Sequence, residues 1–401
     1  MILFAEAKNR VLEGTNVVGK TETVPVIDAL NRVLAASITA PFNVPNADNS
    51  AMDGYGVRYD DLQSDRPVTL TVIADLPAGD RFEHPLQTRQ AVRIMTGAPI
   101  PVGCDCVVPQ EDVKTQPGQV IIPPGQKRGA HIRLSGEDLA VGQPVLPRGR
   151  KLGPADLGLL TSLGLVDIPV FQKIRVALLS TGNEIMTPGI PLKPGWVYDS
   201  NRTSLRAALQ SLGVDVLDLG LVPDQREAIA HALTRGGQQA DAIISTGGVS
   251  VGDFDLVKQV LKELGEIVFW KVAMQPGKPQ AYGRLGQAMF FGLPGNPVAC
   301  LVVYHLIVKQ ALNKMMGANE IPLPVLSLPF HGQLKKKAGR MNFLRGRVHF
   351  DAPAAFVETT GPQGSGILSS MAMANALIMV PEEVTQLSHG DPVAVLLLDQ
   401  H

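Results

Sequence analysis

The sequence predicts a multidomain α/β protein, and three observations support this fold class. The chain has 401 residues, more than one ordinary domain needs, so about two to four compact units are expected. Its hydrophobic content of 45% is that of a globular protein, while 40 Gly and 31 Pro indicate many turns and short strands. Between residues 174 and 312, apolar runs alternate with amphipathic stretches, which is typical of a parallel sheet covered by helices.

The N-terminal part of the chain predicts a small β domain flanked by helices. Residues 41–140 are rich in Pro and Gly and contain short apolar runs such as Val68–Ile73, which favours short strands. The segments Ala5–Leu12, Asp28–Ala36 and Pro154–Ser162 are predicted to be helical. If the β segment is an insertion, these helices would pair across it.

The central segment predicts one sheet with helices packed on it. Its strands are expected at Ile174–Leu179, Val214–Leu219, Ala242–Ser245, Ile267–Val272, Gln280–Gly283 and Ala288–Phe291. Its helices are expected at Asn201–Ser211, Gln225–Thr234, Asp255–Leu264 and Pro297–Asn313. This order implies right-handed crossovers, with a ligand crevice at the carboxyl ends of the strands.

The C-terminal part predicts a small β barrel or sandwich, because turn residues separate several short apolar runs. These runs are Pro322–Leu328, Asn342–Phe350, Ala354–Glu358, Ala376–Val380 and Pro392–Leu397.

Charge and composition disfavour several kinds of partner. The formal net charge is −1, so the chain has no general electrostatic attraction to nucleic acid or to an anionic membrane surface. No stretch reaches the roughly 18 apolar residues of a membrane span, and the N-terminus does not resemble a secretory signal, so we expect a cytoplasmic protein. The three cysteines are too few for a disulfide framework, and the pair Cys104 and Cys106 lacks a second Cys/His pair for a zinc site.

The first central strand ends in a glycine turn suited to a phosphate. Ser180, Thr181 and Gly182 follow the apolar run, so free backbone N–H groups and hydroxyls would face the crevice. Glu184, directly after this turn, is a candidate ligand of a hard cation. The same residues also fit an ordinary strand-to-loop turn.

A second glycine turn repeats this arrangement. Gly247 and Gly248 follow another apolar strand and let the backbone approach a ligand closely, and Ser250 adds a hydroxyl. Asp255, at the expected start of a helix, either caps that helix or binds Mg²⁺. Because the pattern occurs twice, a shared ligand role is favoured over chance.

A third strand-turn-helix junction contains Pro294, Gly295, Asn296 and Pro297, and Pro297 suits the first position of the following helix. Just upstream, Lys278 offers a point charge to a phosphate, although an isolated lysine on a turn would be an ordinary surface residue. The three turns, the lysine and the acids predict a site where Mg²⁺ neutralises a phosphorylated substrate. The chain lacks a phosphate-loop motif, a dinucleotide fingerprint and a nucleophile elbow, which disfavours a kinase, a dehydrogenase and a serine hydrolase.

These turns, in this order, resemble the large domain of the molybdopterin molybdenumtransferases, the family that includes the bacterial enzyme MoeA and the C-terminal domain of gephyrin. Four further segments resemble family signatures outside the central region: residues 49–55, 95–101, 133–138 and 364–370. Together the matching segments span nearly the whole chain.

The resemblance implies four structural units. They are a helical linker domain of residues 1–40 and 141–172, an inserted β domain of residues 41–140, a molybdopterin-binding α/β domain of residues 173–324, and a C-terminal β barrel of residues 325–401. It further implies a homodimer whose active cleft lies between the α/β domain of one subunit and the inserted β domain of the other. Asp53, Thr96 and Asp138 would then reach the site across the interface.

The reaction that the resemblance implies is Mg²⁺-dependent insertion of molybdate into adenylylated molybdopterin, with release of AMP. Glu184 and Asp255 match positions associated with magnesium and nucleotide binding, Asp224 matches another acidic site position, and Lys278 matches a substrate-side lysine. Gln275 departs from the pattern, because many relatives carry Lys or Arg there. A molybdopterin adenylyltransferase would be a candidate partner that hands over the substrate.

Two other functions are compatible with the sequence. A related α/β domain with a similar Gly-Gly turn adenylylates molybdopterin, but that family usually lacks the extra domains that residues 1–170 and 325–401 represent. The other is a dimeric scaffold without catalysis, as gephyrin-like domains can be. The retained acids and glycine turns argue against the scaffold.

Overall fold

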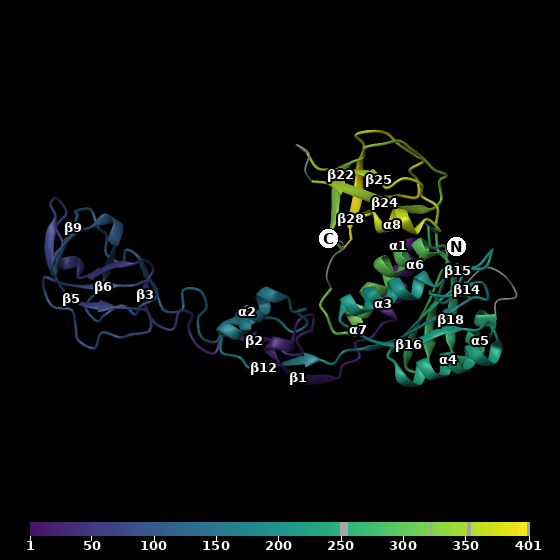
Figure 1. Ribbon diagram of the computed structural model, residues 1–401, viewed down its shortest axis with the longest axis horizontal. Helices are drawn as coiled ribbons and strands as arrows, with labels where there is room; N and C mark the ends of the chain where they lie inside the picture. Colours follow the sequence, from purple (N-terminus) through teal and green to yellow (C-terminus); the bar gives the residue numbers. More distant parts are fainter. Residues whose placement is uncertain (249–255, 321–322, 351–353, 399–401) are drawn as a thin grey trace. The chain divides into compact units, whose positions relative to one another are not determined.

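The computed structural model describes residues 1–248, 256–320, 323–350 and 354–398 (Figure 1). Contacts between residues divide the chain into two compact units. The first unit contains Met1–Ala36, Arg148–Leu157 and Val166–His401, and the second contains Ser37–Pro147 and Gly158–Leu165. Because this division does not test the four predicted units, their bounds stay a prediction.

A six-stranded sheet in the first unit carries the predicted crevice. Its order is β16 (Asp215–Val222), β13 (Arg175–Thr181), β17 (Ala242–Thr246), β21 (Ala288–Leu293), β20 (Pro279–Leu285) and β18 (Glu266–Lys271). The first four strands run parallel, whereas β20 pairs antiparallel with both of its neighbours. The parallel-rich sheet is confirmed. Its antiparallel edge follows from the turn at Gly286, which is too short for a parallel crossover.

Helices cover both faces of this sheet (Figure 1). One face carries α3 (Ser200–Leu212) and a continuous helical run made of α6 (Pro297–Val303), a π-helical turn (Tyr304–Val308) and α7 (Lys309–Met315). The other face carries α4 (Arg226–Gln239) and α5 (Leu256–Leu264). Along β13, Leu178 is buried with the first set of helices and Leu179 with the second. Strands buried on both faces are apolar throughout, which is why the sequence predicts them well.

The strands near the C-terminus curl into a small barrel. The order is β22 (Val325–Pro329), β28 (Pro392–Leu397), β26 (Ala376–Val380), β24 (Met341–His349) and β25 (Phe356–Thr359), with antiparallel neighbours. Phe330, directly after β22, bridges back to Val357 of β25, so the predicted C-terminal barrel is confirmed. The sequence did not predict β19 (Met274–Gln275), which pairs parallel with β24 and ties the barrel to the loop that follows β18.

The second unit is built on another six-stranded sheet, which confirms the predicted β domain. Its order is β7 (Cys106–Pro109), β4 (Gly54–Val57), β6 (Gln90–Ile94), β5 (Val68–Leu76), β9 (Gln119–Ile122) and β8 (Lys114–Gln116). Two short ladders accompany it: β3 (Asn49–Ser50) pairs with β10 (Ile132–Arg133), and β2 (Ile38–Thr39) pairs with β11 (Pro144–Leu146). The core of the sheet includes Val57, Leu70 and Val92, which are fully or almost fully buried.

Two of the three predicted flanking helices are present, as α1 (Phe4–Glu13) and α2 (Pro154–Ser162). The predicted helix at Asp28–Ala36 is wrong, because this region holds only the 3₁₀ turn η1 (Val26–Asp28). Asn31 has a left-handed φ of 63°, which ends any helix there. Leu34 instead forms a bridge to Val170 of β12 (Asp167–Phe171), the partner strand of β1 (Thr21–Pro25).

Short elements complete the described chain. They are η2 (Tyr59–Asp61), η3 (Gln110–Asp112), β14 (Ile185–Met186), β15 (Val197–Tyr198), β23 (Leu334–Lys335), α8 (Leu368–Ala372) and β27 (Gln386–Leu387). None of the helices in the described ranges is long and apolar enough to span a lipid bilayer.

Candidate functional site

A cleft of about 1120 Å³ opens in the first unit, at the carboxyl ends of β13, β17 and β21. These strands are neighbours and end at Thr181, Thr246 and Leu293, so the turns that follow them meet. Most of the predicted site residues line this cleft: Thr181, Gly182, Glu184, Asp224, Gly247, Gly248, Lys278, Pro294, Gly295, Asn296 and Pro297. Three turns far apart in sequence therefore form one site, as the strand order implied.

The turn after β17 requires glycine at two successive positions. Gly247 and Gly248 have φ values of 84° and 66°, in the left-handed region that side chains disfavour. A Cβ on Gly247 would overlap the carbonyl oxygen of Thr181, and a Cβ on Gly248 would overlap Val257 of α5. Gly247 thus lets the β17 turn lie directly against the end of β13, and Gly248 lets it lie against α5.

The turn after β21 is fixed by α6. Asn296 is the residue before this helix and Pro297 is its first residue, where a missing N–H costs no helical hydrogen bond. Asn201 of α3 donates its side-chain N–H to the carbonyl oxygen of Gly295 at 2.7 Å. The predicted strand-turn-helix junction is confirmed, and this bond ties it to the helix beside it.

A polar network lies directly behind the cleft floor. Ser180 is fully buried and does not line the cleft; its hydroxyl donates to Asp199 Oδ1 at 3.0 Å. The Thr246 hydroxyl donates to Ser180 Oγ at 3.1 Å. Arg202 donates through Nε to Asp199 Oδ2 at 2.9 Å, and through a terminal nitrogen to Asp218 at 2.9 Å. The hydrogen bond to Asp199 is the main reason why the pKa of Arg202 is raised.

Asp199 is a cleft residue that sequence reasoning missed. It precedes α3, and its side chain accepts from the backbone N–H of Arg202 at 3.2 Å, as a helix cap does. Although it lines the cleft, it is only 3% exposed. Asp199 stands two residues before the predicted helix at Asn201–Ser211, and an aspartate at the start of a helix is an ordinary N-cap signal that could have located it.

Two of the carboxylates that line the cleft, and its ammonium group, have no partner among the described residues. Within the described ranges, the side chains of Glu184, Asp224 and Lys278 form no hydrogen bond or ion pair with another residue. No group of three or more His, Cys, Asp or Glu side chains suited to a metal ion occurs among the residues described. Mg²⁺ commonly takes one or two protein carboxylates and completes its shell with water and phosphate oxygens, so Glu184 and Asp224 fit it.

One wall of the cleft comes from the loop before α8, which sequence reasoning matched to the family without assigning it to the site. Its cleft-lining residues are Gln363, Gly364, Ser365 and Gly366, and Leu368, the first residue of α8, lines the cleft beside them. Val298 of α6 donates its backbone N–H to the Ser365 carbonyl oxygen at 3.1 Å, which joins this loop to the β21 junction.

Arg345 of β24 holds this loop from behind. It is fully buried, and its guanidinium donates to the carbonyl oxygens of Pro362, Gln363 and Gly364 at 3.0 to 3.1 Å and to Ser370 Oγ at 2.9 Å. Burial lowers the pKa of Arg345 to about 10, so the group is still charged at neutral pH. A charged guanidinium caged by carbonyl oxygens fixes the loop and places positive charge behind the cleft wall.

The other predicted residues lie elsewhere. Asp53, Thr96 and Asp138 belong to the second unit. There, the Asp53 carboxylate accepts from the backbone N–H of Thr96 at 2.7 Å and from its hydroxyl at 2.8 Å, and these bonds lower the pKa of Asp53. Ser250 and Asp255 lie outside the described residues.

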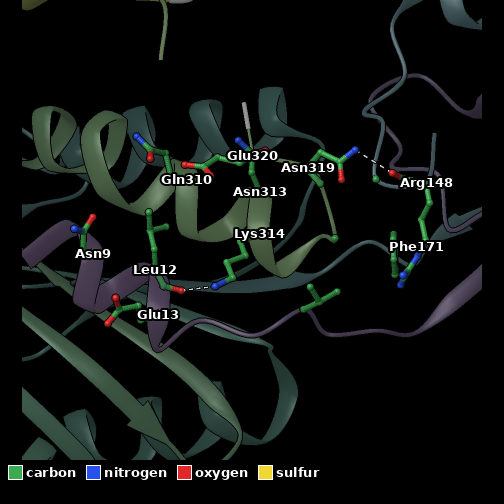
Figure 2. A pocket seen from close by; sticks show the side chains of 14 residues that line it. Asn9, Leu12, Glu13, Arg148, Phe171, Gln310, Asn313, Lys314, Asn319 and Glu320 are labelled. Atoms are coloured by element: carbon green, nitrogen blue, oxygen red, sulfur yellow. Dashed lines mark hydrogen bonds between the residues drawn. The ribbon is translucent and has the colours of Figure 1, made fainter. Parts of the chain in front are cut away.

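A smaller pocket of about 640 Å³ lies between α1 and α7 (Figure 2). In Figure 2, the Leu12 side chain of α1 points toward α7, and the Lys314 side chain of α7 points toward α1. None of the predicted site residues lines this pocket. Lys314 donates to the Leu12 carbonyl oxygen at 2.6 Å, so its ammonium group joins the two helices.

Comparisons with known proteins match the whole chain. Three protein-family models apply: the MoeA N-terminal region (domain I and II) to residues 2–164, the probable molybdopterin binding domain to residues 177–314, and the MoeA C-terminal region (domain IV) to residues 327–398. A solved structure described as the molybdopterin biosynthesis moeA protein from Pyrococcus horikoshii is 29% identical, with a TM-score of 0.86, and the match covers 99% of this chain and 100% of that one. The multidomain fold is therefore confirmed.

Curated relatives agree with this match. The molybdopterin molybdenumtransferase of Haemophilus influenzae is 39% identical over 398 residues, and the alignment covers 98% of both chains. The protein of the same name from Bacillus subtilis is 34% identical, with 95% of this chain and 90% of the relative covered. By its sequence, its fold and the residues gathered in its cleft, the chain belongs to the molybdopterin molybdenumtransferase (MoeA) family.

Proposed function

We propose that this transferase of molybdenum cofactor biosynthesis inserts molybdate into adenylylated molybdopterin in a Mg²⁺-dependent reaction that releases AMP. The observation that supports this most is the composition of the cleft. It combines glycine-turn amides, a lysine and two carboxylates, and these three charged side chains form no hydrogen bond or ion pair with any residue that the structure describes. A doubly charged phosphate link between a pterin and a nucleotide needs that combination of groups.

The carboxylates, the lysine and the backbone amides of the cleft would have different roles, which follow from their charge. Glu184 and Asp224 would hold Mg²⁺, which supplies positive charge to the pyrophosphate and to the departing AMP. Lys278 would add a second positive charge on the substrate side. The backbone N–H group of Gly248 would orient a phosphate without contributing net charge, whereas that of Gly247 donates to the carbonyl oxygen of Leu293 at 3.3 Å. Asp255, outside the described residues, is the further acid expected from the family pattern.

Gln275 lines the cleft, and its place in the sequence is one where many relatives carry a cation. Lys278 lines the same cleft, and the buried Arg345 holds the loop that forms one of its walls, so both provide positive charge at the cleft. We expect these two groups to compensate for the neutral glutamine.

The assembly that we propose is a cytoplasmic homodimer with a shared cleft. Asp53, Thr96 and Asp138 of one subunit would complete the cleft of the other. A molybdopterin adenylyltransferase would be the protein that delivers the substrate, because the cleft needs an already adenylylated pterin.

The two rival functions predict different chemistry. An adenylyltransferase would join AMP from ATP to molybdopterin and would need no molybdate. A scaffold without catalysis would not need the two cleft carboxylates, which form no hydrogen bond or ion pair with another described residue.

Incubation of the purified protein with Mg²⁺, molybdate and adenylylated molybdopterin tests the proposal. We expect AMP release together with a molybdenum-containing pterin, both measured by liquid chromatography with mass spectrometry. Asp224→Asn should slow AMP release by about a hundredfold, because it removes one charge from the Mg²⁺ site. Asp215→Asn, at the opposite end of β16, is the matched control and should not. Product without molybdenum, or adenylyl transfer from ATP, would contradict the proposal.

A further inference from the structure

The direction of the hydrogen bonds behind the cleft floor follows from the number of protons that each group can donate. Asp199 is held by Arg202 through a bond of 2.9 Å, so its carboxylate is ionised and can only accept hydrogen bonds. Ser180 has one hydroxyl proton, and that proton points to Asp199 Oδ1 at 3.0 Å. Ser180 Oγ is then left to accept, and it accepts the Thr246 proton at 3.1 Å.

This chain of bonds determines what Thr246 can offer to a ligand. Its single proton is committed to Ser180, so only lone pairs of Thr246 Oγ1 remain for a group in the cleft. Asp199 also lines the cleft and also presents only acceptors. Thr246 and Asp199 are 1% and 3% exposed, so a ligand that contacts them excludes water from their oxygen atoms. An acceptor that meets no donor of the ligand then stays without a hydrogen bond, which costs free energy.

The neighbouring strand ends in a hydroxyl of different character. The Thr181 side chain lines the cleft and forms no hydrogen bond with any residue that the structure describes. Its proton is therefore available to a phosphate oxygen, as is the N–H group of Gly248 in the adjacent glycine turn. Two threonines on adjacent strands thus differ in polarity: Thr181 can donate, whereas Thr246 can only accept.

We infer that Thr246 and Asp199 form an acceptor edge that selects the hydrogen-bond donors of a 2-aminopteridin-4-one ring, its amino group and the neighbouring ring N–H. A phosphate or carbonyl oxygen in that place would face lone pairs and a carboxylate, which is unfavourable. The phosphate end of the same ligand is left to Thr181 and the glycine turns. The inference rests on the proposed function and adds the orientation of the pterin in the cleft. Ser180 is a positioning residue, because it acts only through Thr246.

Two pteridines of nearly equal size test this edge. Pterin carries an amino group at carbon 2, and lumazine carries a carbonyl oxygen there, so lumazine replaces a donor with an acceptor. Binding of each to the full-length protein can be followed by ligand-observed NMR. We expect the wild-type protein to bind pterin about tenfold more tightly than lumazine or better, which is the usual loss when a buried acceptor goes unpaired.

Three variants distinguish a change in the hydrogen-bond polarity of Thr246 from a general loss of affinity for pteridines. Ser180→Ala frees the Thr246 proton, so Thr246 can donate to lumazine and the preference for pterin should fall to about threefold or less. Thr246→Val should weaken pterin more than lumazine. Ser245→Ala is the matched control: Ser245 is on the same strand and fully buried, and its hydroxyl has no partner among the described residues. It should keep the wild-type preference.

The outcomes distinguish this inference from the proposed function. Equal affinity of the wild-type protein for both pteridines, or an unchanged preference in Ser180→Ala, overturns the acceptor edge while the proposed function stands. If the wild-type protein binds neither pteridine, the acceptor edge is overturned as well, whereas the proposed function is decided by the AMP-release assay.

Discussion

Individual side chains in this protein have their protonation set by very local contacts. Asp53 is an example, because its carboxylate is exposed to solvent and yet accepts two hydrogen bonds from Thr96. The backbone bond is the larger cause and the hydroxyl bond the second, and both hold the pKa of Asp53 below its ordinary value of 3.8. A carboxylate fixed in this way stays ionised and oriented.

Thr96→Val should raise the pKa of Asp53, because the hydroxyl donor is lost. The value should stay below 3.8, since the backbone N–H of residue 96 remains. With a lowered pKa in the folded protein, the contribution of Asp53 to stability is present above its ordinary pKa and fades as the pH falls through the lowered one. NMR titration with carbon-labelled aspartate measures the shift, and Thr96→Ser, which keeps the hydroxyl, is the control. An Asp53 pKa unchanged by Thr96→Val would show that the hydroxyl bond contributes nothing.

The three cysteines should be chemically silent in the folded protein. Burial raises the pKa of Cys104 to about 12 and that of Cys106 to about 11, and it also raises the pKa of Cys300. Since the thiolate is the reactive form, we expect no reaction with a disulfide reagent at neutral pH and three reactive thiols after denaturation. A thiol that reacts rapidly in the native protein would show that its site opens.

At the scale of elements, the shape of the cleft depends on the loop before α8, which a side chain of strand β24 holds in place. Arg345 of β24 donates four hydrogen bonds around residues 362–370, and three of the acceptors are backbone carbonyl groups. These carbonyl groups cannot turn to solvent without moving the loop, so Arg345 determines the shape of the cleft wall. The next exposed arginine on the same strand, Arg347, has no such role.

Arg345→Met should destabilise the fold by roughly 3 kcal/mol, because the side chain keeps its volume but leaves buried carbonyl oxygens unpaired. Urea unfolding measures this change, and Arg347→Met should shift the free energy of unfolding by less than about 0.5 kcal/mol. Equal stability of the two variants would mean that the loop does not depend on the guanidinium.

Elements of the central sheet were predictable because both of their faces are buried, so β13 and β17 are uninterrupted apolar runs. The glycine turns were predictable for the same reason, since each directly follows such a run. The pairing of strands that are far apart in sequence was not predictable. The two-residue strand β19 has no pattern of its own, and Arg345 resembles a surface charge until the fold buries it. The predicted helix at Asp28–Ala36 failed because Asn31 adopts a left-handed conformation that its neighbours do not signal.

At the scale of the whole molecule, the first unit assembles from three separated stretches of sequence. Phe4 of α1 packs against Phe343 of β24 with ring centroids 4.9 Å apart, and β19 pairs with the same strand. The N-terminal helix, the α/β layers and the barrel therefore share one hydrophobic core. Removal of the barrel would expose that core and would also remove the cleft wall at residues 363–366.

Mixed subunits can show whether two chains share each active site. In a dimer with shared clefts, Asp53→Ala and Glu184→Ala disable different sides of a site, and a hybrid of the two keeps one intact cleft. Random pairing makes half of the dimers hybrids, so co-expression of the two inactive variants should restore about one quarter of the wild-type AMP release per subunit. Co-expression of the wild-type chain with the Asp53→Ala, Glu184→Ala double variant is the matched control. Shared clefts predict about one quarter of the wild-type activity in that mixture, because its hybrids contain no intact site, whereas independent clefts predict about one half. Complete inactivity of the first mixture together with half activity of the second would place the whole active site within one chain.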